Sequence, residues 1–97
     1  DLAVVAALAS AFQQVPIART TCAIGEISLT GQVRPVPQLN HRLQEASRLG
    51  FTKALVPTPR SREHPAQALH GMQLLPVASI VDALRALGMH PGGNGRN

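Results

Sequence analysis

Residues 25–36 read Gly-Glu-Ile-Ser-Leu-Thr-Gly-Gln-Val-Arg-Pro-Val, and residues 49–57 read Leu-Gly-Phe-Thr-Lys-Ala-Leu-Val-Pro. With the β-branched residues just before it, the first stretch predicts a strand over 20–29, a tight turn at Thr30-Gly31 and a returning strand. Apolar side chains then recur at the spacing of one helix face and predict a helix that Gly50 ends. The second stretch predicts a short buried strand that Pro57 stops.

Two further segments predict helices at the two ends of this pattern. Residues 1–14 are apolar almost throughout and carry no clear polar stripe, so we expect a helix that is buried on most sides. Ser79, with Asp82 three residues later, predicts the capped start of a last helix that Gly88 ends. Its expected apolar face comprises Ile80, Val81, Leu84 and Leu87.

The remaining segments complete the expected fold. Residues 72–77 predict one more strand, and residues 58–69 predict a loop or a poorly formed helix. The fold class is therefore α/β (an α+β two-layer arrangement), with helices packed on a small mixed sheet. We expect residues 1–88 to form one domain, as a fragment of a larger protein, and residues 89–97 to form a flexible tail.

Composition narrows the classes of function. Nine basic residues, eight of them Arg, outweigh five acidic ones, and the net charge of +4 permits nucleic-acid contact without requiring it. No apolar run is long enough to span a bilayer, so we expect no membrane partner. Cys22 is the single cysteine, which excludes an internal disulfide and predicts a buried structural thiol in a cytoplasmic protein. The histidines lack the spacing of metal ligands and are expected at the surface without a metal. They are His41, His64, His70 and His90.

The run from residue 25 to residue 57 resembles the proteolytic domain of the Lon family. The family pattern is Gly-Glu-Ile-Thr-Leu-x-Gly-x-Val-x-Pro, followed by a helix and by a strand that ends in Pro. The matching positions here are Gly25, Glu26, Ile27, Leu29, Gly31, Val33, Pro35, Leu39 and Val56-Pro57. The resemblance covers most of the chain and implies a Lon-like domain of the ribosomal-protein-domain-2-like superfamily.

Lon enzymes cleave peptides with a Ser-Lys dyad, in which the Lys amine accepts the Ser proton. The resemblance places the dyad Lys at Asn40 and the dyad Ser about two positions before Asp1. An amide cannot act as a general base near neutral pH. Arg42 points roughly 200° away around the helix and holds its proton too tightly. We therefore expect no catalytic residue in this chain; the alternative is a Ser-Lys peptidase domain of the Lon class, active or degenerate.

A further set of matches resembles the RadA (Sms) family of bacterial DNA repair and recombination proteins, which end in a Lon-like domain without the dyad. The matching positions are Asp1-Leu2-Ala3-Val4, Gly25-Glu26, Leu29, Gly31, Arg34, Val36, Arg42-Leu43, Glu45-Ala46 and Leu49-Gly50-Phe51. Gln32 departs from the pattern, which usually has Glu there. The resemblance implies a parent protein with a four-Cys zinc finger, a RecA-like ATPase and this domain. That parent would be a hexameric, DNA-dependent ATPase that drives branch migration.

The same resemblance implies the parent's cofactors and partners. ATP, Mg and Zn are expected in the parent only, with none in this domain. The partners are single-stranded or branched DNA, a RecA-type recombinase and further copies of the chain in a ring. A Lon-like module of a magnesium-chelatase-related competence protein remains a further alternative.

Within this domain, the resemblance implies a ring scaffold and a DNA-contact surface. The candidate DNA-binding residues are Arg34, Arg42, Arg48, Lys53, Arg60 and Arg62. A solvated helix face, a salt bridge between subunits or a mobile loop would explain the same residues. No aromatic residue interleaves with them, so stacking on bases is not expected. Glu26 is expected to pair with an Arg or to cap a backbone group, and Gly25 and Gly31 are expected to serve backbone geometry.

Overall fold

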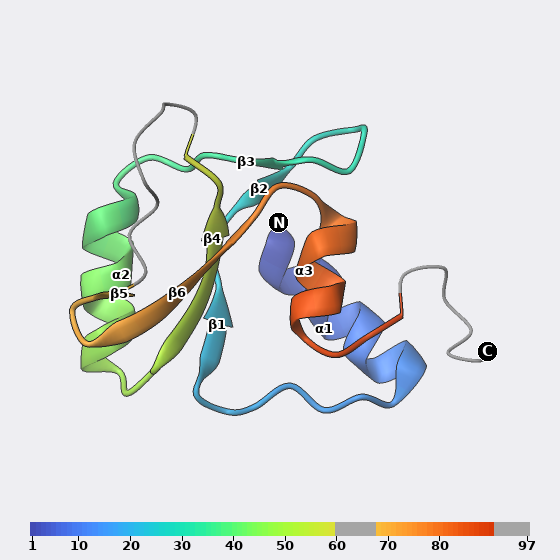
Figure 1. Cartoon of the computed structure of the whole chain (residues 1–97), viewed down its shortest axis with the longest axis horizontal. Coiled ribbons are helices and arrows are strands. Elements are labelled where there is room, and N and C mark those ends of the chain that lie inside the picture. Colours follow the sequence, from blue (N-terminus) through green and yellow to red (C-terminus); the bar gives the residue numbers. More distant parts are fainter. Residues whose placement is uncertain (60–67, 91–97) are drawn as a thin grey trace.

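The computed structural model describes residues 1–59 and 68–90 as a small mixed sheet between helices (Figure 1). The elements are α1 (Leu2–Gln13), β1 (Thr21–Ala23), β2 (Glu26–Ile27), β3 (Val33–Arg34), α2 (Leu39–Arg48), β4 (Lys53–Pro57), β5 (Ala68–Leu69), β6 (Met72–Val77) and α3 (Ile80–Ala86). The main sheet has the order β1-β4-β6-β5, with β5 antiparallel to its neighbour and the other pairs parallel. β2 and β3 form a separate antiparallel hairpin. None of the three described helices has the length and apolar character of a membrane-spanning segment.

The central strand β4 divides the core into two clusters. Ala54 and Val56 pack with Leu43 of α2 on one face of the sheet. Leu55 points the other way and packs with Leu2 of α1 and with α3. Successive residues of a strand face opposite sides, so a strand covered on both faces is apolar without interruption. The predicted α/β fold with a small mixed sheet is confirmed, but helices cover both faces, which gives three layers instead of two (Figure 1).

The predicted turn, helix end and helix cap are largely confirmed. Gly31 has φ +82° in the turn between β2 and β3, and Gly50 has φ +100° after α2. The amide of Phe51 donates to the carbonyl of Ala46 at 3.1 Å, which folds the chain back onto the last turn of the helix. Ser79 Oγ accepts from the amide of Asp82 at 3.1 Å and caps α3.

The strand predicted over residues 20–29 is split in two at Gly25. A side chain there would crowd its neighbours, because a Cβ on Gly25 would lie 2.8 Å from Cγ1 of Val33 and 3.4 Å from Cδ2 of Leu2. The carbonyl of Gly25 also accepts from the amide of Leu2 at 3.1 Å. Gly25 therefore lets the start of α1 approach the hairpin, which agrees with the expected role in backbone geometry.

One expectation about helix burial is wrong and another holds in part. α1 buries only Leu2 and Ala6 fully, because one side packs against β1 and α3 and the other side faces solvent. In α3, Ile80, Leu84 and Leu87 of the expected apolar face are partly buried, but Val81 is 41 % exposed and the fully buried residue is Ala83. Apolar composition alone does not say which side of a helix meets the sheet.

The ends of the predicted loop and tail differ from expectation. Ala68 and Leu69, expected in a loop, pair with β6 as β5. Met89, expected in the tail, is 3 % exposed, and the amide of His90 donates to Oε1 of Gln13 at 3.1 Å. The rest of the predicted loop and tail, residues 60–67 and 91–97, lies outside the described residues.

Candidate functional site

Asn40, the position implied for the dyad Lys, lies in the first turn of α2 with its side chain exposed. The helix starts after Gln38, which takes a left-handed conformation (φ 57°) and provides no side-chain cap. This left-handed residue interrupts the helical conformation on the N-terminal side of Leu39. Asn40 therefore sits at a helix start that is fixed by backbone conformation.

The partner of Asn40 is His70, from the turn between β5 and β6. Nε2 of His70 lies 2.8 Å from Oδ1 of Asn40. An amide oxygen only accepts, so the imidazole donates. His70 and Gly71 have φ 53° and φ 77°, the left-handed pair of a two-residue hairpin turn.

A second hydrogen bond ties the same turn to α2. Oγ of Ser47 donates to the carbonyl of His70 at 2.7 Å. Asn40 and Ser47 are seven residues apart and lie on one face of the helix. The two bonds brace the β5–β6 turn against α2, so Asn40 has a structural role where the dyad would have a base.

An apolar cavity of about 170 Å³ opens beside Asn40. Its lining residues are Leu39, Asn40, Leu43, Val56, Pro57, Pro59, Leu69, Leu74 and Pro76. Asn40 is the only polar side chain among these described lining residues, and none of them titrates. The cavity can hold an apolar group, but its described lining supplies no general acid or base.

The hairpin places two charged residues at paired positions. Glu26 on β2 is in register with Arg34 on β3, and both are exposed. They border a shallow surface depression with residues 27–30 of the turn. The register brings a carboxylate and a guanidinium to adjacent strands, but the described residues show no ion pair between them, so the expected pairing of Glu26 with an Arg stays a prediction.

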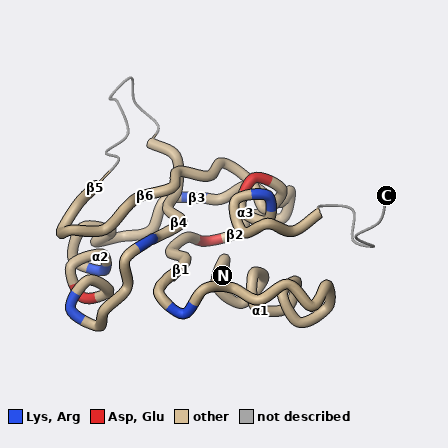
Figure 2. Tube along the Cα trace, turned by 60° about the horizontal axis from the view of Figure 1, so that its bottom comes forward, with Lys and Arg blue, Asp and Glu red and all other residues tan. Residues whose placement is uncertain are grey.

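The described DNA-binding candidates lie on three different elements. Arg34 is on β3, Arg42 and Arg48 are on α2, and Lys53 begins β4. Figure 2 shows Lys and Arg positions on separate elements of the chain. Only Arg42 and Arg48 among the described candidates share an element, and they lie about 120° apart around α2. Arg60 and Arg62 lie outside the described residues.

The two α2 arginines already have contacts. Nη1 of Arg48 lies 3.0 Å from a carboxylate oxygen of Glu45, one turn away on the helix. Nε of Arg42 donates to the carbonyl of Pro37 at 3.2 Å. Both side chains are exposed, so these contacts are weak and remain open to competition from a phosphate.

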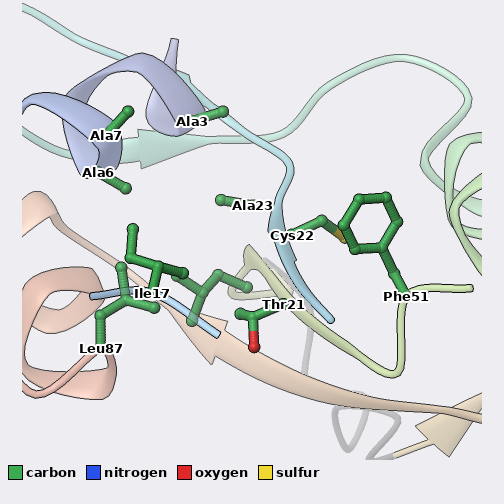
Figure 3. Close-up of a pocket in the computed structure, with 10 residues that line it drawn as sticks. Ala3, Ala6, Ala7, Ile17, Thr21, Cys22, Ala23, Phe51 and Leu87 are labelled. Carbon is green, nitrogen blue, oxygen red and sulfur yellow. The ribbon is translucent and has the colours of Figure 1, made fainter. Parts of the chain in front are cut away.

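Cys22 lies half-buried on β1, beside a second apolar cavity of about 210 Å³ (Figure 3). Ala3, Ala6 and Ala7 of α1 form one wall of this cavity, and Phe51 lies beside the thiol. Burial raises the pKa of the Cys22 thiol, which keeps it protonated and unreactive near neutral pH. The prediction of a structural thiol agrees with this environment.

Sequence reasoning misses the contact of His70. The spacing of the histidines places all four at the surface, and His41 and His90 are indeed exposed. The signal that could single out His70 is the dipeptide His70-Gly71 between two short apolar runs, which is a hairpin pattern. Even that signal does not reveal the contact with Asn40, thirty residues away.

Comparison with known proteins gives two consistent results. The family model of the Lon protease (S16) C-terminal proteolytic domain matches residues 1–89. Proteins described as DNA repair protein RadA are 45% identical over 85 residues in Mycobacterium tuberculosis (strain H37Rv) and 42% identical over 84 residues in Synechocystis. The one from Haemophilus influenzae is 38% identical over 87 residues.

These matches cover most of this chain but little of the relatives. They span 88%, 87% and 90% of the chain, and 17%, 16% and 18% of the respective relatives. The resemblance drawn from the residue patterns, to the Lon-like domain of RadA, is confirmed. The chain belongs to the Lon protease (S16) C-terminal proteolytic domain family.

Proposed function

We propose that this chain is a non-proteolytic Lon-like domain that serves as scaffold and DNA contact in a RadA-type, ATP-dependent protein of DNA repair and homologous recombination. Identity of 36–45% to proteins described as DNA repair protein RadA supports the parent's role. The observation that carries the non-proteolytic part is Asn40, which stands at the implied position of the dyad Lys and hydrogen-bonds His70.

In this proposal the chemistry lies in other parts of the parent. The parent is a hexameric, DNA-dependent ATPase in the cytoplasm that drives branch migration of single-stranded or branched DNA together with a RecA-type recombinase. ATP, Mg and Zn bind outside this domain. The Lon-like domain holds the ring together and guides the DNA, and no membrane is involved.

Peptide cleavage would need a base close to the nucleophile, and the described surroundings of Asn40 argue against one. The Asn40 amide is not basic, and the neighbouring imidazole of His70 donates its nearest N–H to that amide. The other side chains that line the adjacent cavity are apolar. None of the described side chains that line this cavity can take a proton from a Ser hydroxyl, and the imidazole beside it, that of His70, is held by Asn40 through Nε2.

The test of the non-proteolytic role is an assay of casein hydrolysis by the purified parent protein. We expect no cleavage above a blank, with or without ATP. Cleavage that a serine-directed inhibitor abolishes would contradict the proposal. A control with active Lon protease in the same buffer shows that the assay detects the activity.

DNA contact is tested residue by residue. Arg34 and Lys53 form no ion pair within the described residues, whereas Arg48 is paired with Glu45. Substituting Arg34 or Lys53 by Ala in the parent should weaken DNA binding. The slope of the logarithm of affinity against the logarithm of salt concentration (the salt slope) should become shallower by about 1 for each phosphate that is no longer neutralised. Arg48→Ala should have a smaller effect. Arg85→Ala, on α3, is the control. Unchanged salt slopes for the variants at Arg34, Lys53, Arg60 and Arg62 would contradict the proposed DNA contact, and only the scaffold role would remain.

The alternative, a degenerate Ser-Lys peptidase of the Lon class, has its own test. Asn40→Lys in the parent returns an amine to the implied dyad position and removes the hydrogen bond with His70. We expect this variant to remain inactive on casein. Cleavage by the variant would mean that a nucleophile and a binding groove persist and that only the base is missing.

A further inference from the structure

Two basic residues lie close together at one edge of the main sheet. β1 and β4 run parallel, so their amino ends meet at the same edge, where Thr21 is in register with Lys53. The carbonyl of Thr20 accepts from the amides of Thr52 and Lys53, at 2.8 and 3.1 Å. Arg19 directly precedes Thr20, so strand pairing brings Arg19 next to the start of β4 (Figure 2).

A turn holds Arg19 at this edge. The amide of Thr21 donates to the carbonyl of Ala18 at 3.0 Å, which closes the turn around Arg19 and Thr20 just before β1 begins. Arg19 and Lys53 are both exposed. Arg19 is absent from the DNA-binding candidates named from the sequence, because its place beside Lys53 depends on strand pairing and not on any local pattern.

Polar side chains extend this pair across a third strand. Gln73 on β6 is in register with Lys53, and its amide donates to the carbonyl of Thr52 at 2.9 Å. The side chains of Thr20, Thr52 and Gln73 are exposed, like those of the two basic residues. We call this set the amino-edge strip; it consists of Arg19, Thr20, Thr52, Lys53 and Gln73.

The described carboxylates leave the charge of this strip uncompensated. Asp1 and Glu26 lie beyond the carboxyl end of β1, and Asp82 lies beyond the carboxyl end of β6, so all three are at the opposite end of the sheet. Glu45, on α2, is paired with Arg48 at 3.0 Å. Among the described residues, therefore, no ion pair engages either cation of the strip.

The composition of the strip indicates which kind of partner fits. An interface between proteins has an apolar core rich in aromatic residues, whereas the strip contains no apolar side chain. Phosphate oxygens accept hydrogen bonds from Arg, Lys, Thr and Gln, which are the residue types present. Because the strip has no aromatic residue for stacking on bases, the contact it can make is with the nucleic-acid backbone.

We propose that the amino-edge strip binds the phosphate backbone of DNA, with Arg19 and Lys53 each neutralising a phosphate. The hydroxyls of Thr20 and Thr52 and the amide of Gln73 donate hydrogen bonds beside them. The inference rests on the DNA contact proposed above, names the surface that makes it and adds Arg19 to its residues. A contact to the backbone alone does not depend on the base sequence.

The test is the salt dependence of binding by the purified parent to two fluorescently labelled single-stranded oligonucleotides of different sequence. The variants are Arg19→Ala, Lys53→Ala and the two combined. Arg19→Lys keeps the charge at the same place and is the matched control for Arg19→Ala. Arg85→Ala, which removes an exposed cation of α3 outside the strip, is the control for net charge.

We expect the salt slope to become shallower by about 1 for each single Ala variant and by about 2 for the double variant, equally with both oligonucleotides. Arg19→Lys and Arg85→Ala should keep the wild-type slope. An unchanged slope for Arg19→Ala, or a loss that Arg19→Lys does not restore, would overturn the inference. If the slope changes for the variants at Arg34 or Lys53 but not for Arg19→Ala, the strip fails while the proposed DNA contact stands.

Discussion

Replacing Gly25 by Ala tests how closely α1 and the β2–β3 hairpin approach each other. The new Cβ would lie 2.8 Å from Cγ1 of Val33 and 3.4 Å from Cδ2 of Leu2. Both neighbours belong to the same core cluster, so neither side chain can turn aside freely. Overpacking of this kind costs about 1–3 kcal/mol. The loss of glycine's freedom in the unfolded chain offsets about 0.4–1 kcal/mol of that cost.

The two ranges leave a loss of up to about 2.6 kcal/mol in the free energy of unfolding, with a midpoint of about 1.3 kcal/mol that we take as the expectation for Gly25→Ala. For a domain of this size, that midpoint lowers the melting temperature by roughly 5–10 °C. Thermal unfolding followed by circular dichroism measures both quantities. Adding Val33→Ala should relieve the clash, so the double variant should be more stable than the sum of the two single changes by about 1 kcal/mol.

Gly31→Ala is the matched control for this experiment. A Cβ there has no atom nearer than 3.9 Å, so its cost comes from the positive φ of +82° and amounts to about 1–2 kcal/mol. Val33→Ala should not relieve that cost. A Gly25→Ala variant as stable as wild type, or one whose destabilisation simply adds to that of Val33→Ala, would refute the reasoning from close approach.

Three further changes probe the cap, the thiol and the brace. Ser79→Ala should lower the free energy of unfolding by about 0.5–2 kcal/mol in urea titration, because the amide of Asp82 loses its acceptor; no change would mean that the cap contributes nothing. Burial raises the pKa of the Cys22 thiol. The protonated thiol therefore contributes its full stabilisation of the fold below the ordinary thiol pKa of about 8.5, and this contribution is lost as pH rises through the raised pKa. Alkylation at mildly alkaline pH should therefore be slower in the folded chain than in urea, and equal rates would contradict the burial. Asn40→Ala should cost about 0.5–1 kcal/mol and speed hydrogen exchange in the β5–β6 turn, because His70 loses its partner; an unchanged turn would exclude the brace.

Much of the fold follows from local sequence signals. The turn glycines, the Ser79 cap and the apolar run of β4 each act over a few residues, where conformation and burial pattern are specific. The run of β4 also indicates a sheet covered on both faces, since Ala54, Leu55 and Val56 are all apolar and all buried. The expectation of two layers is wrong because it does not take this uninterrupted run into account.

The errors have one physical origin. Burial depends on what an element packs against, and apolar composition does not reveal the partner. α1 is apolar enough to suggest burial, yet Leu8 and Phe12 face solvent in the single chain. β5 is only two residues long, so its pairing comes from the neighbouring strand and not from its own pattern.

Of the two hydrogen-bonded residues of the candidate site, only Asn40 is predictable from the sequence. Asn40 follows from the resemblance to the Lon pattern, which fixes a position along the chain. His70 follows from the fold, which brings the β5–β6 turn to α2 across thirty residues of sequence. A side-chain contact between distant exposed residues leaves no periodic or spacing signal.

The measurement closest to the central claim is survival of a strain that lacks the parent gene after DNA damage. Three versions of the gene are compared: the wild type, a version without this domain, and Asn40→Ala. We predict that the version without the domain fails to restore survival, whereas Asn40→Ala restores it to the wild-type level. Failure of Asn40→Ala, with protein levels equal to wild type, would show that this site has an active role and would contradict the account. Full survival without the domain would contradict it as well.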